Sequence, residues 1–169
     1  MAEKIKATEL LLLLLYVDKK SPIYTHTKFQ KMVFLFEKEI KKKYFDHLEK
    51  NLFDFRPYHY GPYSNRLKKD LDFLNSYGFI EILNYDIETN NNLEEEEEEN
   101  KNYFEYKITP LGTNYVEQKV IHKLNYIQIE ALEKLKRGIN NITQDKLLSY
   151  VYRNYPDMTV NSKIRDKYV

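Results

Sequence analysis

The residues best suited to chemistry form a short polar cluster just after the Gly61-Pro62 pair. Its members are Asn65, Arg66, Lys68 and Lys69. Asparagine and arginine make paired hydrogen bonds to base edges, and lysine ammonium groups attract phosphate. Asp70 and Asp72 follow in the same segment and reduce its positive charge. The cluster is therefore typical either of a nucleic-acid contact or of the solvated face of an ordinary amphipathic helix.

Two further groups carry side chains suited to binding. One lies upstream and would contact the backbone of a nucleic acid: Thr27, Lys28 and Lys31. The other precedes the Gly61-Pro62 pair: Arg56, Tyr58, His59 and Tyr60. This second group predicts either a cluster that binds a partner or ligand, or aromatic packing with a local bridge from Arg56.

Composition and spacing argue against enzyme chemistry. The chain has no cysteine, and its histidines are scattered, with no pair at metal-ligand spacing: His26, His47, His59 and His122. Its four glycines cannot supply a glycine-rich phosphate loop, and no nucleophile motif is present. We therefore predict no catalytic residues, no metal site, no cofactor and no enzymatic activity.

Apolar periodicity and turn signals define the elements that must position these residues. We expect helices over 4–17, 27–42, 64–77, from 110 onward, over 125–137 and from 144 to about 154, and strands over 79–85 and 103–109. Turns are expected at 18–23 and at Gly61-Pro62, and Gly138 and Asn140-Asn141 are expected to end the helix before them. In the polar tail, Val160 and Ile164 are the expected apolar anchors.

The charge is unevenly distributed along the chain. Residues 1–85 carry 15 basic against 11 acidic side chains, residues 86–105 carry one against 9, and residues 106–169 carry 11 against 6. The low-complexity segment 86–102 is expected to be a mobile loop. The six consecutive glutamates at 94–99 predict a solubilising loop, a site for a basic partner, or a nucleic-acid mimic or internal competitor for the basic residues.

The order of the expected elements predicts a mainly α protein with a small antiparallel β-hairpin, in the α+β class. Helix, helix, helix and hairpin is the plan of a winged helix-turn-helix, in which the helix before the first wing strand usually enters the major groove. We expect a winged-helix domain over 1–120, with an acidic wing loop at 86–102. A C-terminal helical extension over 121–169 would pack on it.

Four segments resemble a known family: TKFQKMVFLFEKE (27–39), FRPYHYGPYSNRLKKDLDFLNSYGFIE (55–81), YKITPLG (106–112) and LLSYVYRNYPDMTVNSKI (147–164). They look like the prokaryotic YwgA-like group, and more distantly like the Panacea domain of SocA-like antitoxins. The resemblance implies winged-helix proteins linked to regulation, toxin neutralisation or conflict between mobile elements. The acidic run 94–99 departs from that pattern.

The favoured hypothesis is a winged-helix DNA-binding transcriptional regulator or antitoxin-like protein of a prokaryote or its mobile elements. Its partners would be double-stranded DNA, a second copy in a homodimer, and a protein such as a toxin. The alternative is a protein-interaction adaptor that uses the same fold without binding DNA. The apolar run Leu10–Leu15 is too short to span a bilayer, and no export signal is evident, so we expect a cytoplasmic protein without a membrane partner.

Overall fold

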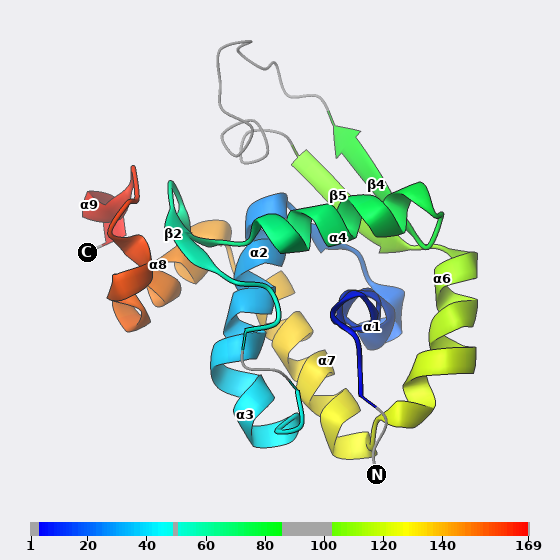
Figure 1. The fold of residues 1–169 in the computed structure, drawn as a ribbon. Helices are drawn as coiled ribbons and strands as arrows, with labels where there is room; N and C mark the ends of the chain where they lie inside the picture. The colour runs from blue at the N-terminus through cyan, green and yellow to red at the C-terminus, as the bar shows by residue number, and fades with distance from the viewer. Residues whose placement is uncertain (1–3, 49–50, 86–102, 169) are drawn as a thin grey trace.

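A computed structural model describes residues 4–48, 51–85 and 103–168 of the chain (Figure 1). Helices dominate, and the strands are short and antiparallel. The elements are α1 (Ala7–Lys20), β1 (Ile23–Tyr24), α2 (His26–Leu35), the π-helical η1 (Phe36–Ile40), α3 (Lys41–Tyr44), β2 (Arg56–Tyr58), β3 (Gly61–Tyr63), α4 (Asn65–Ser76), β4 (Ile80–Tyr85), β5 (Tyr103–Ile108), α6 (Pro110–Tyr115), the π-helical η2 (Val116–Val120), the 3₁₀ turn η3 (Ile121–Lys123), α7 (Tyr126–Asn140), α8 (Gln144–Asn154), the 3₁₀ turn η4 (Pro156–Thr159) and α9 (Arg165–Tyr168). The predicted α+β class with a mainly helical chain is confirmed.

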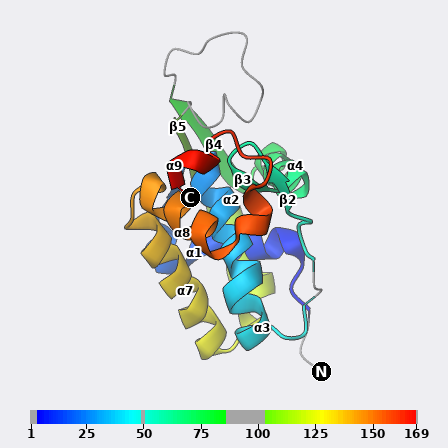
Figure 2. The same ribbon diagram turned by 90° about the vertical axis from the view of Figure 1, so that its left-hand side faces the viewer.

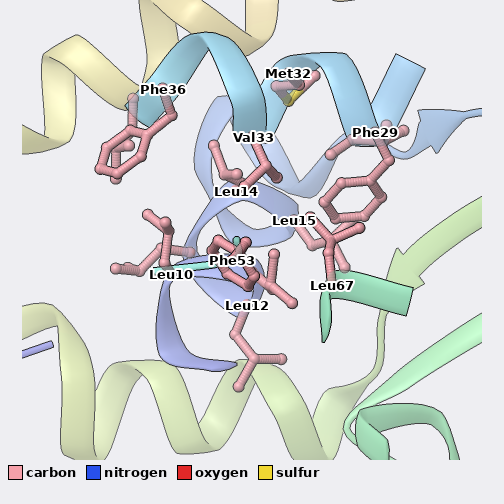
Figure 3. Close-up of a cluster of buried hydrophobic side chains, with 14 of the residues drawn as sticks. Leu10, Leu12, Leu14, Leu15, Phe29, Met32, Val33, Phe36, Phe53 and Leu67 are labelled. Atoms are coloured by element: carbon pink, nitrogen blue, oxygen red, sulfur yellow. The ribbon is translucent and has the colours of Figure 1, made fainter. Parts of the chain in front are cut away.

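Helix α1 occupies the centre of the fold. Figure 1 looks almost along its axis, with α2, α4, α6 and α7 arranged around it. Every leucine of Leu10–Leu15 is buried, as expected for a helix that is apolar on all sides. Figure 3 shows leucines of α1 meeting Phe29, Met32 and Val33 of α2, with Leu67 of α4 beside them. One buried cluster therefore connects the helices that surround α1.

The three-stranded sheet has the order β1-β5-β4 and is antiparallel throughout. The predicted hairpin is confirmed, because Ile80 pairs with Ile108 and Ile82 pairs with Tyr106. Strand β1 was not predicted: the sequence indicated a turn up to residue 23, whereas Ile23 pairs with Tyr106. Two residues are too few to show an alternating pattern, and their partner lies far away in the sequence.

A second hairpin corrects the predicted turn at Gly61-Pro62. The turn lies instead at His59-Tyr60, and Gly61, with φ of 88°, begins β3 opposite Tyr58. Pro57 and Pro62 face each other in this pair. In an antiparallel ladder, pairs that exchange N–H···O bonds alternate with pairs that do not. Two prolines can occupy a pair of the second kind without breaking the hairpin.

The C-terminal helices bring two further corrections. Gly138 does not end its helix, because α7 continues to Asn140 and buries Lys136 and Ile139 on either side of the exposed glycine. Val160 is 56% exposed and is no anchor, whereas Ile164 packs against the core.

Residues on both sides of the predicted boundary at 120/121 share the buried cluster, including Leu124, Leu132 and Leu148. Figure 2 shows α7 beside α2 and α3, and α8 beside α2, with the short α9 packed against α8. Within the described residues, no helix is long and apolar enough to cross a membrane. The predicted mobile acidic loop, 86–102, lies outside the described residues.

Candidate nucleic-acid interface

Helix α4 presents one buried and one exposed side. Leu67, Leu71 and Leu74 are buried at helical spacing, as the sequence predicts. The Ser64 hydroxyl accepts a hydrogen bond from the backbone N–H of Leu67 and so caps the helix. Asn65 and its neighbours Arg66 and Lys69 are exposed in the first turns. The described structure therefore leaves the predicted contact residues accessible to a ligand.

The two groups that the sequence suggested separately meet in one place. A hollow of about 180 Å³, here called the α4 hollow, lies between the β2–β3 hairpin and the start of α4. Its polar lining is Asp54, Arg56, Tyr58, Tyr63, Asn65 and Arg66. The hollow therefore combines guanidinium, amide and phenol groups, which are the groups that bind phosphates and base edges.

The β2–β3 hairpin brings only part of its predicted group to this hollow. Arg56 and Tyr58 line it, and the Tyr58 ring lies 5.5 Å from the ring of Tyr63. His59 and Tyr60 form the turn and are half-buried. The backbone carbonyl of His59 accepts a hydrogen bond from the N–H of Lys163 at 2.8 Å, so the turn is tied to the C-terminal segment.

Both arginines of the hollow have acidic neighbours. The Arg56 Nε lies 3.1 Å from Asp54 Oδ1, in an exposed pair that confirms the predicted local bridge. The Arg66 Nε lies 3.8 Å from Asp70 Oδ2. Burial raises the pKa of Asp70, against the opposing effect of the Arg66 guanidinium. The Arg56–Asp54 pair is exposed and contributes little to stability, so the Arg56 guanidinium can exchange it for a phosphate at little cost.

A buried hydrogen-bond network holds the start of α4 in place. The Gln30 side chain of α2 accepts from the Ser64 N–H at 2.8 Å and donates to the Ser64 carbonyl at 3.0 Å. The Ser64 hydroxyl donates to the carbonyl of Phe53. Lys31 Nζ donates to the carbonyl of Pro62 at 3.0 Å. These bonds fix the β3–α4 junction to α2, so the α4 hollow rests on a rigid support.

His26 extends this network toward the sheet. Its Nε2 lies 3.1 Å from the amide nitrogen of Gln30, and its Nδ1 lies 2.8 Å from the Tyr106 hydroxyl. The amide nitrogen can only donate, so Nε2 must accept and the imidazole is neutral. Burial, together with the nearby Lys68 and Lys31 ammonium groups, lowers the pKa of His26 to about 3.

The sequence predicted that Thr27, Lys28 and Lys31 of α2 contact the backbone of a nucleic acid. This prediction is wrong for two of them and altered for the third. Thr27 is 4% exposed and Lys31 is 1% exposed, so neither can reach a nucleic acid. Lys28 is half-buried, and its Nζ donates to the carbonyl of Ile142 at 2.6 Å. Partial burial also lowers its pKa. These polar residues serve packing between α2 and its neighbours, which helical periodicity alone does not reveal.

Sequence reasoning missed the buried residues that support the site from inside the protein. Gln30 and His26 lay in the apolar-periodic helix without a distinguishing motif, and their roles depend on partners 34 and 80 residues away. Lys68 is less exposed than Asn65, Arg66 and Lys69: its side chain is 25% exposed, and its Nζ lies 3.4 Å from Asp72 Oδ2. Tyr63 could have been identified from the sequence, because it directly precedes the capping residue Ser64.

No protein-family model matches the chain, and no curated protein sequence matches it. The geometry of the described residues therefore carries the functional argument. Among those residues no group of three or more His, Cys, Asp or Glu side chains is placed to hold a metal ion.

Proposed function

We propose that this chain is a winged-helix DNA-binding protein of the regulator or antitoxin-like kind. The observation that carries the proposal is the α4 hollow, where Arg56, Asn65 and Arg66 converge at the start of an exposed helix. The hairpin β4–β5 follows that helix directly, as the wing follows the recognition helix in winged-helix proteins. In this proposal the start of α4 enters the major groove, with Lys69 beside it.

The connection between α2 and α4 differs from a short helix-turn-helix. It contains η1, α3 and the β2–β3 hairpin, so a long connecting segment separates α2 from α4 in the sequence. Gln30 and Ser64 nevertheless bond directly across it. The hairpin then provides Arg56 and Tyr58 on the outer side of α4, which a simple turn would not do.

Binding to a random-sequence DNA duplex, measured by fluorescence anisotropy over a salt series, tests the proposal. Arg66→Ala with Lys69→Ala is expected to lower the affinity at least tenfold and to reduce the slope of log K against log salt by about 0.9 for each lost phosphate contact. Asn65→Ala with Lys69→Ala tests the same face while leaving the Arg66–Asp70 pair intact. The matched control is Lys134→Ala with Lys146→Ala, two exposed lysines of α7 and α8. Equal affinities for all forms would refute a role of α4 in DNA binding.

One observation favours the adaptor alternative. Phe73, Tyr77 and Leu111 are 50%, 63% and 52% exposed near the far end of α4, and the rings of Phe73 and Tyr77 lie 4.7 Å apart. Exposed aromatic groups of this kind suit a protein contact. If the wild-type protein binds no duplex in 50 mM salt, the adaptor becomes the better proposal. The expected homodimer and toxin partner stay predictions, for which a sedimentation measurement of oligomeric state is the first step.

A further inference from the structure

Two more hollows are linked to the α4 hollow through shared lining residues. The second, of about 250 Å³, is here called the N-terminal hollow; Lys4, Lys6, His47 and Arg66 are among its lining residues. The third, of about 490 Å³, is called the η2 hollow, and Lys6, Lys119, His122 and Lys123 contribute to its lining. Arg66 lines the first and second hollows, and Lys6 lines the second and third. The three hollows are therefore neighbours, each sharing a basic side chain with the next, and together they are here called the track.

This track is strongly cationic. Within the described residues its lining includes six basic side chains: Lys4, Lys6, Arg56, Arg66, Lys119 and Lys123. Among the described residues the carboxylates in this lining are Asp54 and Glu9, and each faces a cation of the track. Arg66 also faces Asp70, which lies outside the lining. A row of neighbouring hollows with this excess of positive charge attracts a polyanion.

Hydrogen bonds and an ion pair of a buried carboxylate hold the base of the η2 hollow in place. Glu9 is 2% exposed, and its carboxylate accepts from the Lys6 N–H at 2.9 Å and from the Tyr115 hydroxyl at 3.0 Å. Lys123 Nζ lies 3.2 Å from the same carboxylate. Glu9 thus ties the start of α1 to α6 and η3, while the exposed Lys6 and Lys119 remain at the rim. The rim lysines supply the net positive charge, because Glu9 compensates Lys123.

We infer that this track is a second contact zone for the phosphate backbone of duplex DNA, running from the α4 hollow past Lys6 to Lys119. The inference rests on the proposed function and extends it beyond α4. It places flanking contacts on the N-terminal segment and on η2. In Figure 1 the hairpin β4–β5 extends upward from α4, whereas the lower end of the α6–η3 segment lies on the other side of that helix. The track therefore approaches DNA from the side opposite the wing strands.

The test is the salt dependence of binding by the variant Lys6→Gln with Lys119→Gln. Two lost phosphate contacts should reduce the slope of log K against log salt by about 1.8. Between 50 and 200 mM salt the wild-type protein should then lose about 12-fold more affinity than the variant. The control, Lys134→Gln with Lys146→Gln, removes the same charge at positions that line none of the three hollows, and should keep the wild-type slope.

The outcomes separate this inference from the proposed function. If the wild-type and control proteins bind duplex DNA and the Lys6/Lys119 variant shows the same slope, the track makes no phosphate contact and α4 alone can still bind. If the control loses as much slope as the variant, the effect is one of net charge, which also overturns the track. If the wild-type protein binds no duplex, or binds only single-stranded RNA, both the track and the proposed function fail. Far-UV circular dichroism and thermal unfolding confirm that each variant is folded.

Discussion

Gln30→Leu should destabilise the protein more than any change to the exposed face of α4. Gln30 is fully buried, and its amide makes hydrogen bonds with Ser64 and His26. Leucine has a similar size but cannot replace these bonds. The Ser64 N–H would lose its acceptor, and His26 Nε2 would lose its donor, while the Ser64 carbonyl would keep the N–H of Lys68 at 3.4 Å.

Leaving the buried Ser64 N–H without an acceptor costs about 1–3 kcal/mol. A domain of this size has about 5–15 kcal/mol of stability, so the loss is a substantial fraction of it. Urea unfolding followed by circular dichroism measures the loss. Gln118→Leu, on the exposed surface of η2, is the control and should change stability by no more than about 0.5 kcal/mol. A Gln30→Leu protein as stable as the control would refute the argument that this network supports the start of α4.

Three other substitutions test packing and pH dependence. In Gly112→Ala the new Cβ would lie 2.1 Å from the Phe79 carbonyl oxygen, so we expect a loss of about 1–3 kcal/mol or more in urea unfolding. In Gly138→Ala the new Cβ meets nothing within 4 Å at an exposed position of α7, so we expect a gain of about 0.5–1 kcal/mol. A gain for Gly112→Ala, or a loss for Gly138→Ala, would contradict the respective assignment. Because the folded pKa of His26 is about 3 and its ordinary value is 6.5, the unfolded chain binds more protons between these pH values and stability falls as pH decreases. In His26→Gln this dependence should weaken by up to about 1.4 kcal/mol per pH unit between pH 4 and 6, and an unchanged profile would show that the imidazole is not buried as described.

The elements that carry their own local signals were predictable. Helix α4 follows from three leucines at helical spacing, a capping serine and Gly78, whose φ of 78° suits the residue after a helix. The β4–β5 hairpin follows from its β-rich runs. Each of these signals lies within a few residues of the structure that it specifies.

The errors arose where distant contacts override local preference. Gly138 is a weak helix former, but burial of Lys136 and Ile139 holds α7 together around it. The Lys136 ammonium donates to the carbonyl of Val17 at 2.7 Å, across a separation of 119 residues. Lys31 was predicted to contact the backbone of a nucleic acid, yet its ammonium group meets the carbonyl of Pro62 inside the protein. A lysine carries no local mark that distinguishes these two situations.

The candidate site was predictable in composition but not in assembly. Arg66 and Asn65 were identified from residue type, and Arg56 and Tyr58 were identified as a separate group. Only the β2–β3 hairpin, whose turn was misplaced by two residues, brings the groups into one hollow. Lys6 and Lys119 could not be connected from the sequence, because the contact between the start of α1 and the α6–η3 segment depends on buried Glu9.

The distribution of charge indicates which part of the protein surface would bind DNA. The near-neutral net charge of +1 argues against a general affinity for polyanions. In the described structure, however, the basic residues at the start of α4 and along the track line a row of neighbouring hollows. A duplex laid along the track would meet this local positive charge, so local charge, rather than net charge, determines the binding that the salt series measures.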